Sequence, residues 1–170
     1  MSETLAGRAA VEGWDNFAVA QVGASAALAG LVFVGLSVNL TRVLQAPGVL
    51  GRAGEAIVVL AALLFAASAV IVPGQSLGLL AAELTAIGLV DWLVVVGLQY
   101  VARRIEIEGR PASFAGRIVL GQLATLPFIV AGIALAARGE GGLYWFALGA
   151  FGSYAVAFVD AWVLLVEINR

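Results

Sequence analysis

The sequence predicts an all-α membrane protein, a bundle of five transmembrane helices with its N-terminus outside and its C-terminus in the cytoplasm. Composition is the first reason, because 62% of the 170 residues are hydrophobic and 12% are charged, against about 45–50% and 25% in soluble domains. The mean hydropathy of +1.05 is the second, since a folded chain of ~150 residues still exposes about 30% of its unfolded surface. Lipid must therefore cover part of this chain.

Five apolar stretches, each long enough for the ~20 helical residues that cross a hydrocarbon core, form a single helical domain over 1–170. Each is expected to be a helix, because backbone in lipid must satisfy its own hydrogen bonds. Pro73-Gly74 ends the second stretch as a turn, and residues 5–16 form either a short interfacial helix or a partly ordered tail. The expected spans are about 17–40, 55–72, 76–102, 117–137 and 143–168.

The orientation follows from arginine, which supplies all nine basic residues. Seven arginines flank one end of the expected spans and two flank the other, so the positive-inside rule places the first end in the cytoplasm. Four of them lie around the connection between the third and fourth spans, where alternating Arg and Glu favour a solvated, self-paired helix end over a docking site for a partner or anionic lipid. These four are Arg103, Arg104, Arg110 and Arg117.

The absence of His, Cys and Lys from the sequence removes several kinds of chemistry. Without them there is no thiolate nucleophile or disulfide, no imidazole base or usual zinc cluster, and no Schiff base. A net charge of −2 argues against nucleic acid, whose binding needs a basic face. We therefore expect no cofactor and no metal, and membrane lipid as the surrounding partner.

Three acids inside the expected spans carry the functional signal, because burying a charge in a membrane costs at least ~2.5–3.5 kcal/mol. Glu83 and Asp91 lie on the third span, where Gln99 continues their spacing, and Asp160 lies on the fifth. Together they favour a path for protons, cations or a small solute. The structural alternatives are an ion pair of Asp160 with Arg117 or Arg103, and acids on the third span that are protonated or hydrogen-bonded. The expected hydrogen-bond partners are Thr85, Thr125, Gln122 and Asn39.

Small residues mark two surfaces for close helix packing. Gly149, Ser153, Ala157 and Ala161 step by four along the fifth span, and Asp160 shares their face, so it should point into protein. Gly23 and Gly30 lie on a similar seam of the first span. Two seams exceed what a lone bundle needs, which predicts a homo-oligomer or a partner membrane protein. Pro127 should kink the fourth span and free the carbonyl of Leu123.

Catalysis is not expected. Two aspartates on different spans invite comparison with intramembrane aspartyl proteases, which makes an intramembrane hydrolase the lesser alternative. However, LVDWL and FVDAW lack the Gly-flanked motif of that family, and the two acids lie at different depths, whereas a shared-proton dyad needs contact. No phosphate loop or dinucleotide fingerprint is present either.

The segments WDNFAVAQVGASAALAGLVFVGLSVNL (Trp14–Leu40), LGRAGEA and IVPGQ (Ile71–Gln75) resemble a group of small actinobacterial-type membrane proteins without an established activity. The resemblance covers about the first hundred residues and implies a multi-pass protein of the bacterial cytoplasmic membrane. Some members bear names that suggest modulation of a membrane protease, but no motif here carries such a role and no site residue is transferred. We expect an oligomeric channel or transporter, or alternatively a non-catalytic accessory subunit of a larger membrane complex.

Overall fold

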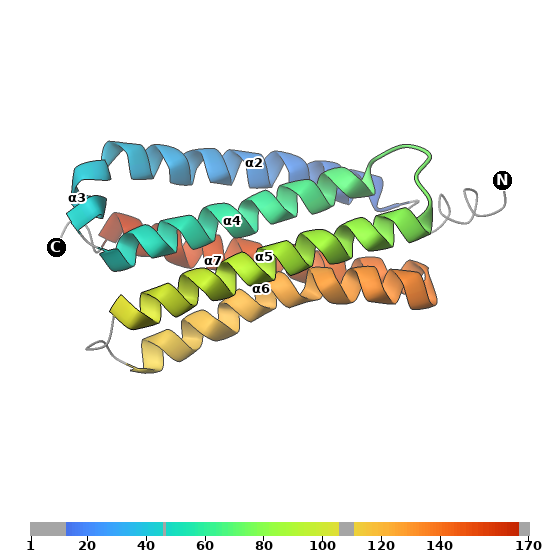
Figure 1. Ribbon diagram of the computed structural model, residues 1–170. Helices are drawn as coiled ribbons and strands as arrows, with labels where there is room; N and C mark the ends of the chain where they lie inside the picture. Colours follow the sequence, from blue (N-terminus) through green and yellow to red (C-terminus); the bar gives the residue numbers. More distant parts are fainter. Residues whose placement is uncertain (1–12, 46, 106–110, 167–170) are drawn as a thin grey trace.

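The computed structural model describes residues 13–45, 47–105 and 111–166, and every regular element in these ranges is a helix. Five of the helices are long and apolar enough to cross a membrane. The elements are α2 (Asp15–Val38), α3 (Leu40–Gln45), α4 (Pro47–Val70), α5 (Leu77–Ile105), α6 (Pro111–Arg138), the 3-10 turn η1 (Glu140–Gly142) and α7 (Leu143–Val166) (Figure 1). The expected interfacial helix over 5–16 lies largely outside the described residues, as does Arg110.

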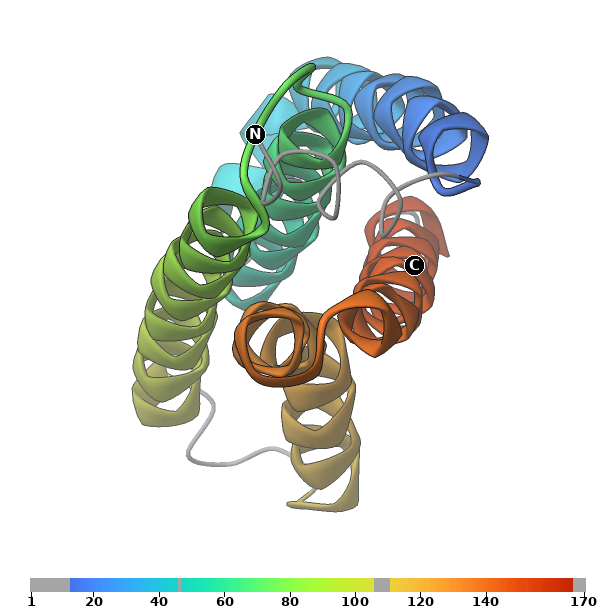
Figure 2. The same ribbon diagram turned by 90° about the vertical axis from the view of Figure 1, so that its right-hand side faces the viewer.

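The five long helices run alternately up and down, so that successive helices lie side by side (Figures 1 and 2). The helix α4 has the largest buried share of the five, because it contacts α2, α5 and α7. The helix α6 packs between α5 and α7. This order brings the starts of α4 and α6 to the same end of the bundle as the ends of α5 and α7.

The segment between the first two spans differs from the expected connection over 41–54. It is largely helical, with α3 followed at once by α4, which begins at Pro47 rather than near residue 55. Proline suits the first turn of a helix because its nitrogen has no hydrogen to leave unbonded. This earlier start places Arg52 and Glu55 inside α4. At the other end α4 stops at Val70, and Gly74 turns the chain with φ of 74°.

The largest apolar core fills the half of the bundle nearest the turn at residues 71–76. Phe128 and Phe146, with ring centroids 6.1 Å apart, are fully buried there beside Leu84. At the outer edge of this half, Trp14 meets Tyr144 edge to face at 5.1 Å, which joins the start of α2 to the start of α7. Close van der Waals packing is the force available between helices in lipid.

Glycine allows α6 and α7 to approach at their middle. A Cβ atom at Gly152 would lie 2.7 Å from the carbonyl carbon of Leu123 and 2.9 Å from Cα of Ala124, so no larger residue fits without a shift. Leu123 precedes Pro127 by four residues, and Pro127 stands inside α6, where it removes the usual helical donor to that carbonyl. The carbonyl that proline frees thus faces the glycine of the neighbouring helix.

The small-residue seams have different surroundings. On α7, Gly149, Ser153 and Ala157 are buried, and Gly149 lies against the ring of Phe128, while Ala161 is half-buried. On α2, Gly23 and Gly30 are exposed and a Cβ at either would meet nothing within 4 Å. The seam of the first span therefore takes no part in packing within the described chain.

Candidate functional site

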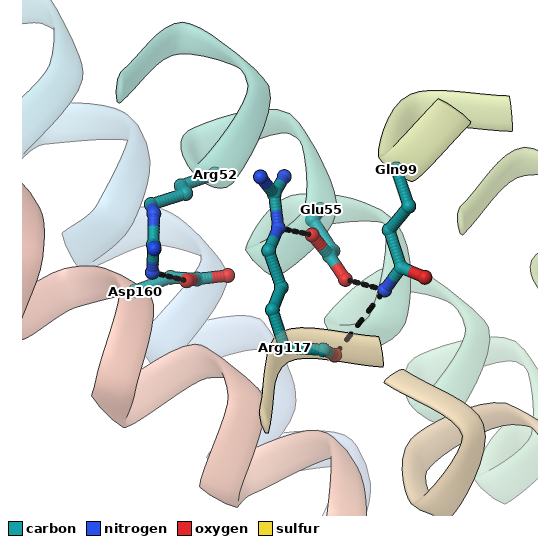
Figure 3. A network of polar contacts seen from close by, with 5 residues as sticks. All are labelled: Arg52, Glu55, Gln99, Arg117 and Asp160. Carbon is teal, nitrogen blue, oxygen red and sulfur yellow. Dashed lines mark hydrogen bonds and ion pairs between the residues drawn. The ribbon is translucent and has the colours of Figure 1, made fainter. Parts of the chain in front are cut away.

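A buried ion pair between α4 and α6 forms the centre of the candidate site. Arg117 donates from Nε to Oε2 of Glu55 over 2.7 Å, and the two side chains are 5% and 1% exposed. Gln99, on α5, donates through Nε2 to Oε1 of Glu55 over 2.6 Å and to the backbone oxygen of Arg117 over 3.3 Å. Three helices are therefore joined through one carboxylate (Figure 3).

A second ion pair, between α4 and α7, lies beside the first. Arg52 contacts Oδ1 of Asp160 at 3.4 Å, with the arginine 20% exposed and the aspartate 4% exposed. Arg52 and Glu55 are three residues apart, so they share one side of α4, and each reaches a different neighbouring helix. Two guanidinium groups and two carboxylates thus meet near the end of the bundle (Figure 3).

Glycine makes room for this network. A Cβ at Gly121, one turn after Arg117 on α6, would collide with Nε2 of Gln99 and lie 3.2 Å from Oε1 of Glu55. The absence of a side chain at Gly121 therefore lets the amide and carboxylate approach α6. Because a buried charge must be paired and hydrogen-bonded to be tolerated, this glycine is as much part of the site as the charged residues.

A pocket of about 240 Å³ lies beside the two ion pairs, between α4, α6 and α7. Two of the residues that line it carry three buried polar atoms that have no hydrogen-bond partner among the described residues. They are Nη1 and Nη2 of Arg117 and Oδ2 of Asp160. The pocket is lined by Arg52, Glu55, Gly116, Arg117, Leu120, Val156, Val159 and Asp160.

Asp91 lies apart from this network, at the middle of α5. It is 3% exposed, and neither carboxyl oxygen has a hydrogen-bond partner among the described residues. It lines an apolar groove of about 370 Å³ between α4 and α5, beside Val58, Ala62 and Val94.

None of the four polar side chains expected to hydrogen-bond Asp91 does so. Thr85 and Thr125 bond backbone carbonyls of their own helices, Asn39 bonds the carbonyl of Gly35, and Gln122 accepts from Trp92.

Glu83 is nearer the other end of α5, where it accepts a hydrogen bond from Gln75. The expected polar line of Glu83, Asp91 and Gln99 is therefore divided. Asp91 and Gln99 share the buried face of α5, but Val95, which is fully buried, stands between them. In the described structure the four expected path residues thus occupy three separate places: the network with Gln99 and Asp160, the groove with Asp91, and the turn with Glu83.

Two expectations about charged residues are wrong. Asp160, on α7, pairs with Arg52 of the neighbouring helix α4, not with Arg117 or Arg103. Arg117, expected at a solvated helix end, is buried against Glu55. Arg103 and Arg104 are exposed and lie over the rings of Phe114 and Tyr100, with the guanidinium carbons 5.9 and 4.9 Å from the ring centroids.

Glu55 is the residue of this candidate site that the sequence-based prediction missed. It stands where an apolar run begins, and a charge at that place is ordinarily a boundary residue. The available signal was the pair Arg52 and Glu55 three residues apart, in the helical stretch LGRAGEAIVV. The spacing reveals a common face, whereas the partners of that face come from other helices.

The chemistry open to this site is that of carboxyl, guanidinium and amide groups. No group of three or more potential metal-ligating acids occurs among the described residues. The sequence has no His or Cys to serve as a base or nucleophile. Comparisons with protein-family models, curated proteins and solved structures gave no match.

Proposed function

We propose that the chain spans a cytoplasmic membrane, N-terminus outside, and carries protons across it, with Asp91 as the carboxyl group at the middle of the membrane. The observation that carries this proposal is the burial of Asp91 at mid-helix with both oxygens unpaired. A carboxyl group in a membrane is costly, and acids retained there commonly belong to proton relays. Protons need no wide pore, which fits the close packing around Phe128 and Phe146.

The proposed orientation puts the ion-pair network on the cytoplasmic side. Arg52 and Glu55 lie near the start of α4, and Arg117 lies near the start of α6. These two helices begin at the same end of the bundle (Figure 1). Arg103 and Arg104 lie in the last turn of α5 at that same end, whereas Arg138 ends α6 at the opposite one. This distribution is the one that the positive-inside rule favours.

The route between Asp91 and the cytoplasmic side would run along the buried face of α5. Gln99 is eight residues beyond Asp91, or about 12 Å along the helix. Val95 interrupts this distance with an apolar side chain. In this proposal a transient chain of water must pass Val95 before a proton reaches Glu55 and Gln99, so Val95 is the barrier that sets the rate.

An accessory subunit is the second candidate, and the exposed face of α2 favours it. Gly23 and Gly30 are open to a neighbouring helix, and such small residues let helix backbones approach closely. A subunit of this kind would hold a larger membrane complex together and conduct nothing by itself.

Proton flux into liposomes tests the proposal. The full-length protein is reconstituted with a pH-sensitive dye inside the vesicles, and a potassium gradient with valinomycin supplies the driving voltage. We expect flux above that of empty liposomes, its loss in Asp91→Asn, which cannot exchange a proton, and its retention in Asp91→Glu. Asp15→Asn is the matched control, because Asp15 is exposed at the start of α2.

Flux that is equal in Asp91→Asn and wild type would rule out Asp91 as the carrier. Flux no greater than in empty liposomes would rule out conduction altogether. The second result, together with an unlike membrane protein crosslinked to α2, would favour the accessory subunit.

A further inference from the structure

The pocket beside the ion pairs is open on one side and charged at its base. Gly116 on α6 and Val159 on α7 are exposed at its rim, whereas Arg117 and Asp160 are buried at its base. Its volume of about 240 Å³ exceeds by several-fold the ~30 Å³ that one water occupies in the liquid. The pocket therefore has room for a ligand of several heavy atoms. Binding of a ligand there does not depend on whether the protein carries protons.

Arg117, which lines the pocket, has unused donors. Its Nε is engaged by Glu55, but Nη1 and Nη2 have no partner among the described residues although the side chain is 5% exposed. Buried donors of this kind are nearly always bonded. Two nitrogens of one planar guanidinium match the two oxygens of a carboxylate or a phosphate, which they bind side by side. Figure 3 shows both atoms extending beyond the bond to Glu55.

Asp160, which lines the same pocket, has an unused acceptor. Its Oδ1 accepts from Arg52, while Oδ2 is buried without a partner among the described residues. No ion pair joins Asp160 to Arg117 in the part of the chain that the structure describes. An ionised carboxylate oxygen only accepts hydrogen bonds, so its missing partner must be a donor. A ligand that carries both an oxoanion and an N–H donor would satisfy the unused groups of Arg117 and Asp160 together.

We propose that this pocket binds a zwitterion, with its oxoanion on Arg117 and its primary ammonium on Asp160. A free amino acid and the phosphoethanolamine headgroup of a lipid share this chemistry. A phosphocholine headgroup lacks it, because a quaternary ammonium has no N–H to donate. The apolar wall of Leu120, Val156 and Val159 continues from the charged base and offers contact to the hydrocarbon part of either ligand.

Lipid binding to the full-length protein in detergent tests one source of the ligand. Native mass spectrometry is used with phosphatidylethanolamine and phosphatidylcholine at equal concentration. We expect phosphatidylethanolamine to bind about tenfold more tightly, as a charge-assisted hydrogen bond gained or lost implies. In the second arm, alanine and O-phosphoethanolamine are titrated calorimetrically, and saturable binding there identifies a soluble zwitterion as the ligand.

Two variants locate the binding. Asp160→Asn removes the negative charge and should abolish the preference for a primary ammonium. Gly116→Leu should fill the mouth of the pocket and weaken every zwitterion, and it keeps the test decisive if Asp160→Asn does not fold. Gly97→Leu is its matched control, since both glycines are exposed on helices and a Cβ at either meets nothing within 4 Å, but Gly97 lies outside this pocket.

Equal binding of the two lipids, with no binding of alanine or O-phosphoethanolamine, would overturn the proposal and leave the unpaired atoms to water. A preference that survives in Gly116→Leu would also overturn it, because the ligand would then bind elsewhere. Loss in Gly116→Leu with retention in Gly97→Leu supports it, whichever zwitterion binds. Proton flux is a separate readout, so either proposal can fail alone.

Discussion

The two halves of the bundle are built from the same helices but held by different contacts. Around Phe128 and Phe146 the helices meet through apolar side chains and glycines. Around Glu55 and Arg117 they meet through charges that no water reaches freely. Apolar contacts add up atom by atom and tolerate small losses, whereas a buried charge needs its partner, so the loss of one partner costs more than the loss of both.

The two halves also differ in how completely their buried polar groups are hydrogen-bonded. Among the described residues, three buried atoms without a hydrogen-bond partner belong to Arg117 and Asp160 in the polar half. Two more belong to Asp91 at the middle of α5, and one belongs to Gln75 at the opposite end. Polar groups that lack partners are unfavourable unless a ligand or water satisfies them. The polar half therefore has more buried polar groups left for a ligand or water to bond than the half around Phe128 and Phe146, and it is where we propose that the zwitterion binds.

Removal of one member of the buried pair should have the largest effect. Arg117→Ala leaves the carboxylate of Glu55 buried without its counter-ion, and we expect a loss of about 3–5 kcal/mol in the free energy of unfolding. The measurement is unfolding by sodium dodecyl sulfate in mixed micelles, followed by tryptophan fluorescence.

The paired replacement is the control for that prediction. Glu55→Leu together with Arg117→Met should recover most of the lost free energy, because exchanging a buried ion pair for apolar side chains is often neutral or stabilising. A double variant as unstable as Arg117→Ala would mean that the two halves do not differ in the way described.

A single methyl group between α6 and α7 should have a smaller effect. Gly152→Ala places a Cβ against the backbone of Leu123 and Ala124, and we expect a loss of about 1–3 kcal/mol from overpacking. The same unfolding assay checks it. Gly97→Ala is the control, and should gain about 0.5–1 kcal/mol, the usual advantage of alanine in a helix interior; equal behaviour of the two variants would refute the close approach.

The smallest effect is expected on the outer face of α2, which belongs to neither half. Gly23→Ala meets no atom within 4 Å, so the isolated chain should gain about 0.5–1 kcal/mol from helix propensity. If α2 packs closely on a second helix through this face, the variant should instead weaken that association. Size-exclusion chromatography with light scattering distinguishes the outcomes, since it reports mass rather than stability.

Much of the fold was predictable, because each long helix depends on a local run of apolar residues. The turn at Pro73-Gly74 and the small-residue face of α7 follow from local chemistry in the same way. The start of α4 at Pro47 was not predicted, since residues 41–54 were expected to connect two spans and the second span was expected to begin at residue 55. Asp91 and Asp160 were singled out from their places in apolar helices, and both are buried. Glu55 was missed, and Arg117, expected at a solvated helix end, is buried as well.

The sequence by itself determined that five apolar helices form and which few charged residues they carry, because helix length and hydropathy are properties of neighbouring residues. Only the tertiary structure decided which charges meet. Glu55 bonds residues 44 and 62 positions away, and Arg52 bonds one 108 positions away. Such partners depend on the rotation and depth of each helix against its neighbours, which side-chain packing sets and no local pattern contains.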